Sequence, residues 1–222
     1  MRKIVVAAFV SVDGVMQAPG GPQEDPTGGF ELGGWCAGYF DDVVGEAVVE
    51  MLSAPYDLLL GRKTYDIFAG HWPHITEPSQ PDYPIASQFN RIAKYVATHR
   101  PESLTWKNSH GLGPDPVAKL RALKKEDGPA LLTQGSSELV QMLFANDLVD
   151  ELRTLTFPIV LGKGKRLFGG TAQPAGFRLE RTKVSPNGVV IASYVRAGAV
   201  KTASFQLEQP PPEELERRKN LT

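Results

Sequence analysis

The sequence predicts an α/β domain in which a mostly parallel β-sheet is covered by helices on both faces. Two observations support this fold class. Short, continuous apolar runs, typical of strands buried on both faces, alternate with stretches of helical spacing through the middle of the chain. Near the end, two alternating runs at 177–184 and 189–195 flank the turn Ser-Pro-Asn-Gly, which predicts an antiparallel hairpin at the sheet edge. The expected architecture therefore has three layers, helix, sheet and helix.

Five further strands are expected from apolar runs that precede the hairpin, and they lie at 3–10, 56–61, 93–98, 129–133 and 150–160. The first run follows two cations, as in a signal peptide. It is short and turns at once, so we expect a buried strand instead. The last run, DELRTLTFPIV, is long and apolar. We expect it near the edge of the sheet, where an unpaired apolar strand favours association with a second chain.

Five helices are expected between these strands, at 40–53, 63–69, 84–92, 115–126 and 136–146. In the first of them the apolar residues recur on one face. The fourth has the strongest start signal, because Asp115 can cap it and Pro116 fits the first helical position. The fifth begins with a serine and a glutamate that are spaced much like a capping box.

Two segments fall outside this alternation. Residues 14–39 contain many glycines and prolines together with scattered aromatic residues. A loop of this length in a compact domain is usually functional or disordered, and its aromatics argue against plain disorder, so we expect it to cover a functional cleft. Residues 199–222 contain a triple proline and mixed charges with little apolar content. We therefore expect a domain at 1–198 and an extended or disordered tail at 199–222.

Composition limits the function classes. The 222 residues are 41% hydrophobic and 22% charged, with a formal net charge of −1, so nothing favours a polyanion or an acidic membrane as the main partner. Cys36 is the only cysteine, which excludes an internal disulfide and a cysteine-cluster metal site. No stretch approaches the roughly 18 apolar residues of a membrane helix. We expect a cytoplasmic protein without a metal, in which phosphate recognition is local.

The stretch LLLGRKT, residues 58–64, passes directly from a strand into a helix and suggests an anion site. Gly61 lets a ligand approach the main chain, and a helix start exposes free backbone amides. Arg62 and Lys63 add charge, with arginine suited to forked phosphate binding, and Thr64 adds a hydroxyl donor. The same residues also fit the solvated start of a surface helix, and this stretch alone does not decide between the two interpretations.

Two later strand ends have the same layout. The donors and cations that follow them are Thr98, His99, Arg100, Gly135, Ser136 and Ser137. Ligands of open α/β sheets bind outside the carboxyl ends of the strands, and three phosphate-competent ends imply a ligand with more than one phosphate, such as a dinucleotide. The chain lacks G-x-G-x-x-G after its first strand and lacks a P-loop motif, which argues against a Rossmann domain and a P-loop NTPase.

Several stretches carry a family resemblance when taken together and in order. They are SVDGVM, LLLGRKTYDIF, HWP, WKNS and LLTQGSSELVQMLFANDLVDELRTLTFPIVLGKGKRLF. Over about residues 3 to 196 the sequence resembles the dihydrofolate reductase-like superfamily, and more closely the reductase domain of the bacterial bifunctional riboflavin deaminase-reductase. The resemblance implies a three-layer α/β/α dihydrofolate reductase-like fold, NADPH as cofactor and a homodimer.

The resemblance also assigns the three strand ends. It places residues 61–64 at the cofactor's phosphates, residues 98–100 near the adenosine 2′-phosphate and residues 135–137 at the pyrophosphate. There is one departure from the family pattern. Typical dihydrofolate reductases have consecutive glycines where this chain has Gln-Gly-Ser, which puts the backbone geometry there in question. The deaminase half of the riboflavin enzyme is missing, because zinc deaminases need H-x-E and P-C-x-x-C and one cysteine cannot supply them.

A proton-transferring residue is less clearly marked. In dihydrofolate reductases a carboxylate at the start of the first helix meets the pterin ring, and Asp41 and Asp42 occupy the corresponding region here. Burial could tune such a carboxylate for proton transfer, which makes Asp41 the catalytic candidate. The alternative is that both residues favour the helix N-terminus through its dipole.

Other polar residues have weaker signals. We interpret Asp13 as a turn residue, His71 and His74 as loop residues, and find no partner for His110. Two lysines in the segment LGKGKRLF, Lys163 and Lys165, either grip a substrate phosphate or keep a glycine-rich turn soluble.

The sequence therefore predicts an oxidoreductase that transfers hydride from NADPH to a small heterocyclic or carbonyl/imine substrate. Within enzymes, the alternatives are reduction of the ribosylamino-pyrimidine intermediate of riboflavin synthesis or of dihydrofolate. From another class, the alternative is a nucleotide-binding protein without turnover on the same fold.

Overall fold

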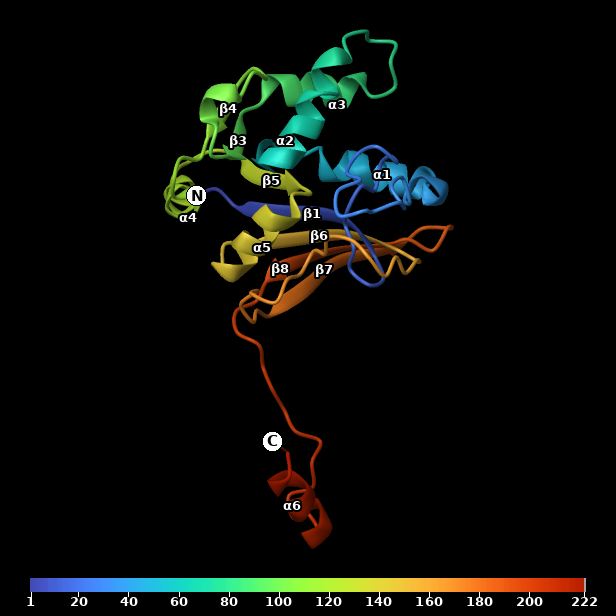
Figure 1. Cartoon of the computed structure of the whole chain (residues 1–222), viewed down its shortest axis with the longest axis vertical. Coiled ribbons are helices and arrows are strands. Elements are labelled where there is room, and N and C mark those ends of the chain that lie inside the picture. The colour runs from blue at the N-terminus through green and yellow to red at the C-terminus, as the bar shows by residue number, and fades with distance from the viewer. Residues whose placement is uncertain (222) are drawn as a thin grey trace.

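A computed structural model describes residues 1–221 and is built around one eight-stranded sheet (Figure 1). The strand order is β4-β3-β2-β5-β1-β6-β8-β7. Pairing is parallel from β4 to β6 and antiparallel between β6, β8 and β7. The strand bounds are β1 Ile4–Ser11, β2 Tyr56–Gly61, β3 Lys94–Ala97, β4 Ser109–Gly111, β5 Ala130–Gln134, β6 Glu151–Phe157, β7 Phe177–Val184 and β8 Val190–Arg196.

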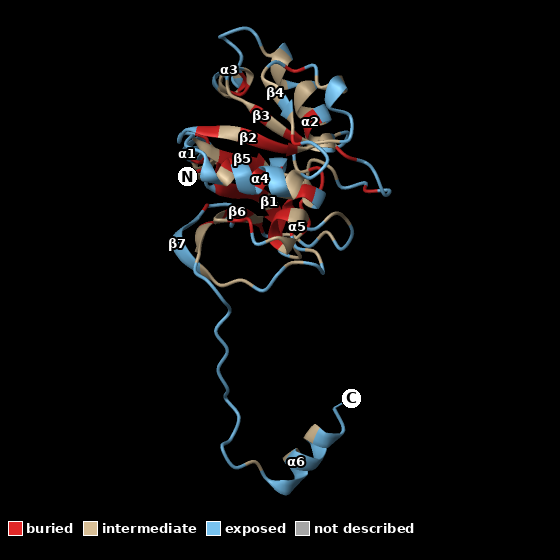
Figure 2. Cartoon of the chain, turned by 90° about the vertical axis from the view of Figure 1, so that its left-hand side faces the viewer, coloured by how far each residue is buried: buried red, intermediate tan, exposed pale blue. Residues whose placement is uncertain are grey.

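Helices cover both faces of the sheet, which confirms the predicted three-layer α/β class. Buried residues of α4 and α5, such as Leu120 and Leu143, pack in one core cluster. Buried residues of α1, α2 and α3, such as Val44, Tyr65 and Phe89, pack in a second cluster on the other face. Figure 2 shows the central strands as the buried layer. The helix bounds are α1 Asp42–Met51, α2 Arg62–Ala69, α3 Tyr83–Arg91, α4 Pro116–Lys125 and α5 Ser137–Ala145.

The predicted strands and helices are all present with small shifts at their ends. Asp115 caps α4 as predicted, since its side chain accepts a hydrogen bond from the amide of Ala118 at 2.9 Å. The sequence did not reveal β4, which has only three residues. The run predicted as 150–160 ends earlier, at Phe157, because the next residue is Pro158, which has no amide to donate to the sheet.

One prediction about this run is wrong. The strand β6 is not an unpaired edge, because β1 lies on one side of it and β8 on the other. The hairpin folds back onto β6, so β7 is the edge strand instead. Nearly every residue of β7 is exposed, and its charged residues are those that commonly protect a sheet edge.

The predicted capping box at the start of α5 is also wrong. Ser136 occupies the capping position but makes no side-chain hydrogen bond to the helix. Its backbone is left-handed, with φ +64°, so the hydroxyl points to other partners, described below. Gly135 before it also has positive φ, at +98°. The chain therefore makes the sharp turn with one glycine and one serine, where the family pattern has consecutive glycines.

Residues 14–39, which we call the strap, are packed against the segment after β6. The amide of Met16 donates to the carbonyl of Lys165 at 2.8 Å, and the amide of Leu167 donates to Gly14 at 2.9 Å. A side chain on Gly164 could not be accommodated, because its Cβ would lie 2.5 Å from Val15. The strap is thus held to the loop that follows the central strands.

Asp13 acts as the predicted turn residue and holds the turn after β1 to the loop after β6. Its carboxylate accepts hydrogen bonds from the Ser11 hydroxyl at 2.6 Å and from the amides of Leu161 and Gly162 at 3.0 and 2.9 Å. Arg166 approaches the same carboxylate at 3.3 Å. These donors, the Ser11 hydroxyl first, lower the pKa of Asp13 from 3.8 to about 2.

We expect Asp13→Asn to reduce the free energy of unfolding at pH 7 by about 1 kcal/mol. The folded-state pKa lies below the unfolded value, so this stabilisation is present above pH 3.8 and is lost as the pH falls towards 2. Urea unfolding of both proteins at pH 7 and at pH 2.5 measures it. The difference in free energy of unfolding between wild type and Asp13→Asn should be smaller at pH 2.5 than at pH 7. Equal stability of the two proteins at pH 7 would contradict the stabilising role of the Asp13 carboxylate.

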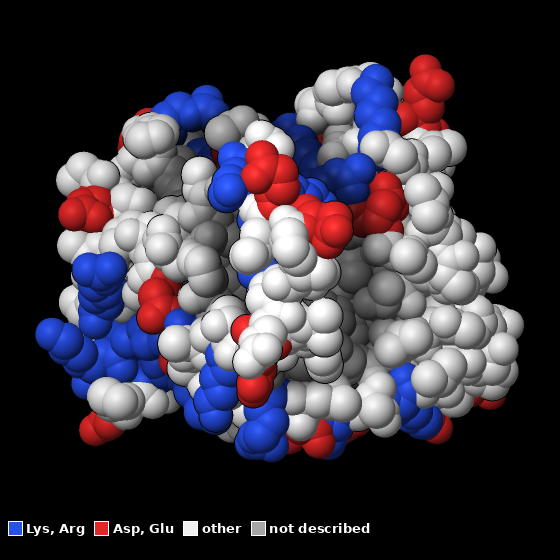
Figure 3. All heavy atoms as spheres, turned by 90° about the horizontal axis from the view of Figure 1, so that it is seen from below, with Lys and Arg blue, Asp and Glu red and all other residues white. Residues whose placement is uncertain are grey.

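Beyond β8 the chain leaves the body of the molecule and ends in the detached helix α6, Pro212–Lys219 (Figure 1). Seen from that side, the surface carries Lys and Arg as well as Asp and Glu (Figure 3). Within residues 1–221 no helix is both long and apolar enough to cross a membrane. In the same residues no group of three or more His, Cys, Asp or Glu side chains is placed to hold a metal ion.

Candidate functional site

Three neighbouring strands bring the predicted residues to one edge of the sheet. β3, β2 and β5 are adjacent and parallel, so their carboxyl ends lie side by side. Residues 61–64 follow β2, residues 98–100 follow β3, and residues 135–137 follow β5. Strand ends that are separated in the sequence therefore lie side by side, and their role as one binding site stays a prediction.

Ser136 joins two of these strand ends. Its hydroxyl accepts a hydrogen bond from the amide of Gly61 at 2.8 Å and donates to the hydroxyl of Thr64 at 2.7 Å. The two chains approach so closely that a Cβ on Gly61 would lie 2.9 Å from the Ser136 side chain. Glycine is therefore required at position 61 by this contact. The serine that departs from the family pattern is the residue that makes it.

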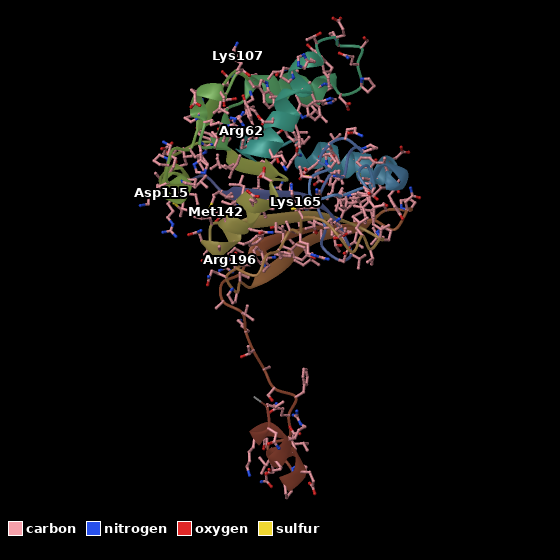
Figure 4. All side chains as sticks on the ribbon, in the orientation of Figure 1. Arg62, Lys107, Asp115, Met142, Lys165 and Arg196 are labelled. Atoms are coloured by element: carbon pink, nitrogen blue, oxygen red, sulfur yellow. The ribbon has the colours of Figure 1, made fainter. Side chains whose placement is uncertain are left out.

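Arg62 joins the third strand end. Its guanidinium donates to the Ser103 hydroxyl and, at 3.3 Å, to the Arg100 carbonyl, while its Nε lies 2.9 Å from Asp66. The side chain is 24% exposed, so it is held against the protein at the start of α2 (Figure 4). In contrast, His99 is exposed, and no hydrogen bond to its side chain is found among the described residues. Arg62 thus fixes the 98–103 turn beside the site.

The geometry suits an anion. Neither α2 nor α5 has a side-chain cap at its N-terminus, so the first backbone amides of both helices are available to a ligand. Gly135 lets a ligand approach the main chain, whereas the space beside Gly61 is filled by the Ser136 side chain. Two uncapped helix starts, the glycine at position 135 and a cation are the features that would hold the phosphates of a dinucleotide. The residues at the three strand ends therefore fit such a group.

One participant was missed by the sequence analysis. Asp25, in the strap, contacts Lys63 at 3.3 Å and Lys165 at 2.5 Å. From the sequence, Lys165 had two interpretations, phosphate binding or solubility, and no pattern indicated this acidic partner. The other lysine of that loop, Lys163, donates to the carbonyl of Gly29 at 3.1 Å. Both lysines thus help to hold the strap.

Asp41 caps α1. Its carboxylate accepts hydrogen bonds from the amide of Val44 at 2.9 Å and from the amide of Asn187 at 3.1 Å. Although desolvation opposes ionisation, these hydrogen bonds lower the pKa of Asp41. Asn187 lies in the β7–β8 turn, and this turn lies beside the carboxyl ends of β6 and β1. Asp41 therefore lies at the same edge of the sheet as the anion site, and its role in proton transfer stays a prediction.

The remaining candidates lie elsewhere. Asp42 is an exposed residue of the first turn of α1. His71 and His74 flank Trp72 in a short 3-10 turn and are exposed, while His110 is an exposed residue of β4. Cys36 is buried, and its burial raises the pKa of the thiol to about 11.

These features define an α/β protein of the dihydrofolate reductase-like fold with a candidate anion site at the carboxyl ends of three strands. Residues 2–191 match the model of the RibD C-terminal domain, and the chain belongs to that family. This is a family of reductase type. A relative of similar length is the uncharacterized protein YyaP of Bacillus subtilis, which is 24% identical over 193 residues, covering 87% of this chain and 94% of YyaP.

Solved structures show the same fold. One is the diaminohydroxyphosphoribosylaminopyrimidine deaminase/5-amino-6-(5-phosphoribosylamino)uracil reductase of Thermotoga maritima, with a TM-score of 0.57, 15% identity and 88% of this chain covered. This chain spans only 57% of that protein. Another is the dihydrofolate reductase of Enterococcus faecalis, solved with NADP(H), with a TM-score of 0.52, 13% identity and coverage of 87% of this chain and 96% of the other.

Proposed function

We propose that this protein is an NADPH-dependent oxidoreductase that transfers hydride to a small heterocyclic or carbonyl/imine substrate. The observation that carries the proposal is the convergence of three strand ends. Ser136 and Arg62 link these ends and leave two helix N-termini without side-chain caps. A ligand with several phosphates matches this arrangement better than a single anion does.

Each part of the site has a proposed role. The amides at the start of α2 and α5, with the residues at 61–64 and 135–137, hold the pyrophosphate. Arg62, with the turn at 98–100, meets the 2′-phosphate. When bound, NADPH supplies the hydride, and the protein supplies orientation and electrostatics. Asp41 stays the candidate for proton transfer because it lies at the same sheet edge.

The names of two solved structures with the same fold support a reductase that uses NADPH. The Thermotoga protein is named as a uracil reductase and the Enterococcus protein as a dihydrofolate reductase complexed with NADP(H). Reduction of 5-amino-6-(5-phosphoribosylamino)uracil or of dihydrofolate is therefore the specific alternative for the substrate.

A non-catalytic nucleotide-binding protein is the second candidate function. It is favoured by one observation, the engagement of the Asp41 carboxylate by two backbone amides, which leaves it a poor proton donor at neutral pH. NADPH oxidation, measured by absorbance across a panel of cyclic imines, carbonyls, pterins and aminopyrimidines, separates the two candidates when set beside NADPH binding. Turnover with any substrate supports the reductase, and binding without turnover across the panel supports the second candidate.

We also predict a two-fold homodimer that uses the strands after residue 149. The register places Leu179, Val184 and Val190 on one face of the hairpin, where they are 48%, 62% and 41% exposed. Exposed apolar side chains on one face of a hairpin favour association. Light scattering at micromolar concentration should give the mass of two chains. A monomeric mass at that concentration would be evidence against the dimer.

A further inference from the structure

The carboxylate of Asp25 contacts two lysines that belong to different parts of the chain, at 3.3 and 2.5 Å. Lys63 belongs to the first turn of α2, and Lys165 belongs to the loop after β6 (Figure 4). Both ammonium groups also reach the Thr27 hydroxyl, at 2.9 and 3.0 Å. The Asp25 side chain is only 9% exposed, whereas that of Lys63 is 50% exposed. The lysines are thus accessible from solvent while the acid that neutralises them is covered.

Two sets of contacts hold the segment around Asp25. The Asp25 carboxylate accepts hydrogen bonds from the hydroxyl of Thr27 at 2.5 Å and from its amide at 3.3 Å. Gln17, itself buried, donates from its amide to the carbonyls of Asp25 and Thr27, both at 2.9 Å. Its oxygen accepts the amide of Lys165 at 2.9 Å. Although burial opposes ionisation, the hydrogen bond from Lys165 keeps the pKa of Asp25 below its usual value. The carboxylate is therefore held ionised against the two lysines.

Two ammonium groups and a hydroxyl form a set of donors that a phosphate would also use. Lys63 is one of the residues proposed above to hold the cofactor's phosphates. A phosphate that arrives at the start of α2 would have to share Lys63 with a carboxylate, and two anions in contact with one cation repel each other. The strap and the ligand therefore compete for the same charge.

We propose that Asp25 is a built-in competitor for the anionic group of the ligand, and that Lys63 exchanges Asp25 for a ligand phosphate on binding. This inference rests on the proposed function, because it takes Lys63 as a phosphate-binding residue. The exchange releases one of the two lysine contacts of Asp25 and loosens residues 25–27 of the strap. The ion pair between Lys63 and Asp25 thus couples ligand binding to the loosening of residues 25–27.

The test compares Asp25→Asn with wild type, using Glu31→Gln as the matched control. Glu31 is an exposed carboxylate of the same strap, and no ion pair to it occurs within the described part of the chain. Asp25→Asn should bind NADPH roughly threefold to tenfold more tightly than wild type, because the competing charge is gone. Glu31→Gln should bind as wild type does. Equal or weaker binding by Asp25→Asn would overturn the proposal and leave the proposed function standing.

Hydrogen exchange of the strap gives a readout that does not depend on NADPH. In wild type, inorganic pyrophosphate should speed exchange of the amides in 18–30, since it takes Lys63 from Asp25. Ligand-free Asp25→Asn should already exchange at least about threefold faster, with no further response to pyrophosphate. If pyrophosphate speeds exchange of the 18–30 amides but NADPH does not bind, the cofactor assignment is rejected and the competition between Asp25 and a phosphate stands. Unchanged or slower exchange in wild type with pyrophosphate would overturn the proposed competition.

Wild-type protein alone provides a check that needs no variant. The Lys63 side chain is 50% exposed and can be reached by ions, so raising the salt concentration from 20 to 500 mM should speed exchange in 18–30 more than in the sheet. Exchange of the strap that is insensitive to salt would count against the ion pair.

Discussion

Replacing Arg62 with alanine is expected to weaken NADPH binding by about tenfold to a hundredfold. The guanidinium lies between the start of α2 and the 98–103 turn, where it contacts Ser103 and the carbonyl of Arg100. The variant loses a cation and also loosens the turn proposed to meet the 2′-phosphate. Titration by NADPH fluorescence measures the loss. If Arg62 meets the 2′-phosphate, NADH affinity falls less, and if it meets the pyrophosphate, both fall equally.

Arg178→Ala is the matched control for this variant. Arg178 is an exposed residue of the edge strand β7, far along the sheet from β2. Its replacement by alanine removes the same charge as Arg62→Ala does. It should leave NADPH affinity unchanged, because a distant exposed charge contributes little. If folded Arg62→Ala protein bound NADPH as tightly as Arg178→Ala does, the residues at 61–64 would be an ordinary solvated helix start.

Lys94→Met is expected to lower the free energy of unfolding by about 2–4 kcal/mol. Lys94 is fully buried, and its ammonium donates to the carbonyls of Ile92 at 2.9 Å and Lys107 at 2.8 Å. It also lies 4.4 Å from the centre of the Trp106 ring. Methionine keeps the length of the side chain but leaves these partly buried carbonyls without the lysine donor. Urea unfolding at pH 7 measures the effect.

Lys107→Met controls for the loss of a lysine. The Lys107 side chain is exposed, so the free energy of unfolding of Lys107→Met should be within about 0.5 kcal/mol of the wild-type value. Burial lowers the pKa of Lys94 from 10.5 to about 8. The unfolded chain therefore binds the proton more tightly, and wild type should gain stability as the pH rises from 8 to 10.5, a slope that Lys94→Met lacks. A Lys94→Met protein as stable as Lys107→Met would contradict this account.

Much of the fold follows from local pattern. Apolar runs and helical spacing predicted the helices α1 to α5 and every strand except β4, and Asp115 with Pro116 predicted the start of α4. The edge position of β6 was predicted wrongly because strand order depends on where the hairpin folds back, which no local run reveals. The capping box at α5 failed because Ser136 adopts a left-handed backbone, and its hydroxyl reaches a residue 75 positions away.

In the candidate site, too, features set by local pattern were predictable and features set by long-range packing were not. The donors at the three strand ends were predictable, because residues that follow parallel strands must gather at one edge. Asp25 was not predictable, because its lysine partners lie 38 and 140 positions away in the sequence. Only the packing of the strap against the loop after β6 brings these three residues together.

The most direct test of the central claim is calorimetric titration of the wild-type protein with NADPH and, separately, with NADH. The three strand ends predict saturable binding of one NADPH per chain, at least about tenfold tighter than NADH, because a contact to the 2′-phosphate is worth at least about 1.4 kcal/mol. Equal affinities would contradict the assignment of Arg62 and the 98–100 turn to that phosphate. An absence of saturable binding by either nucleotide would contradict the site itself.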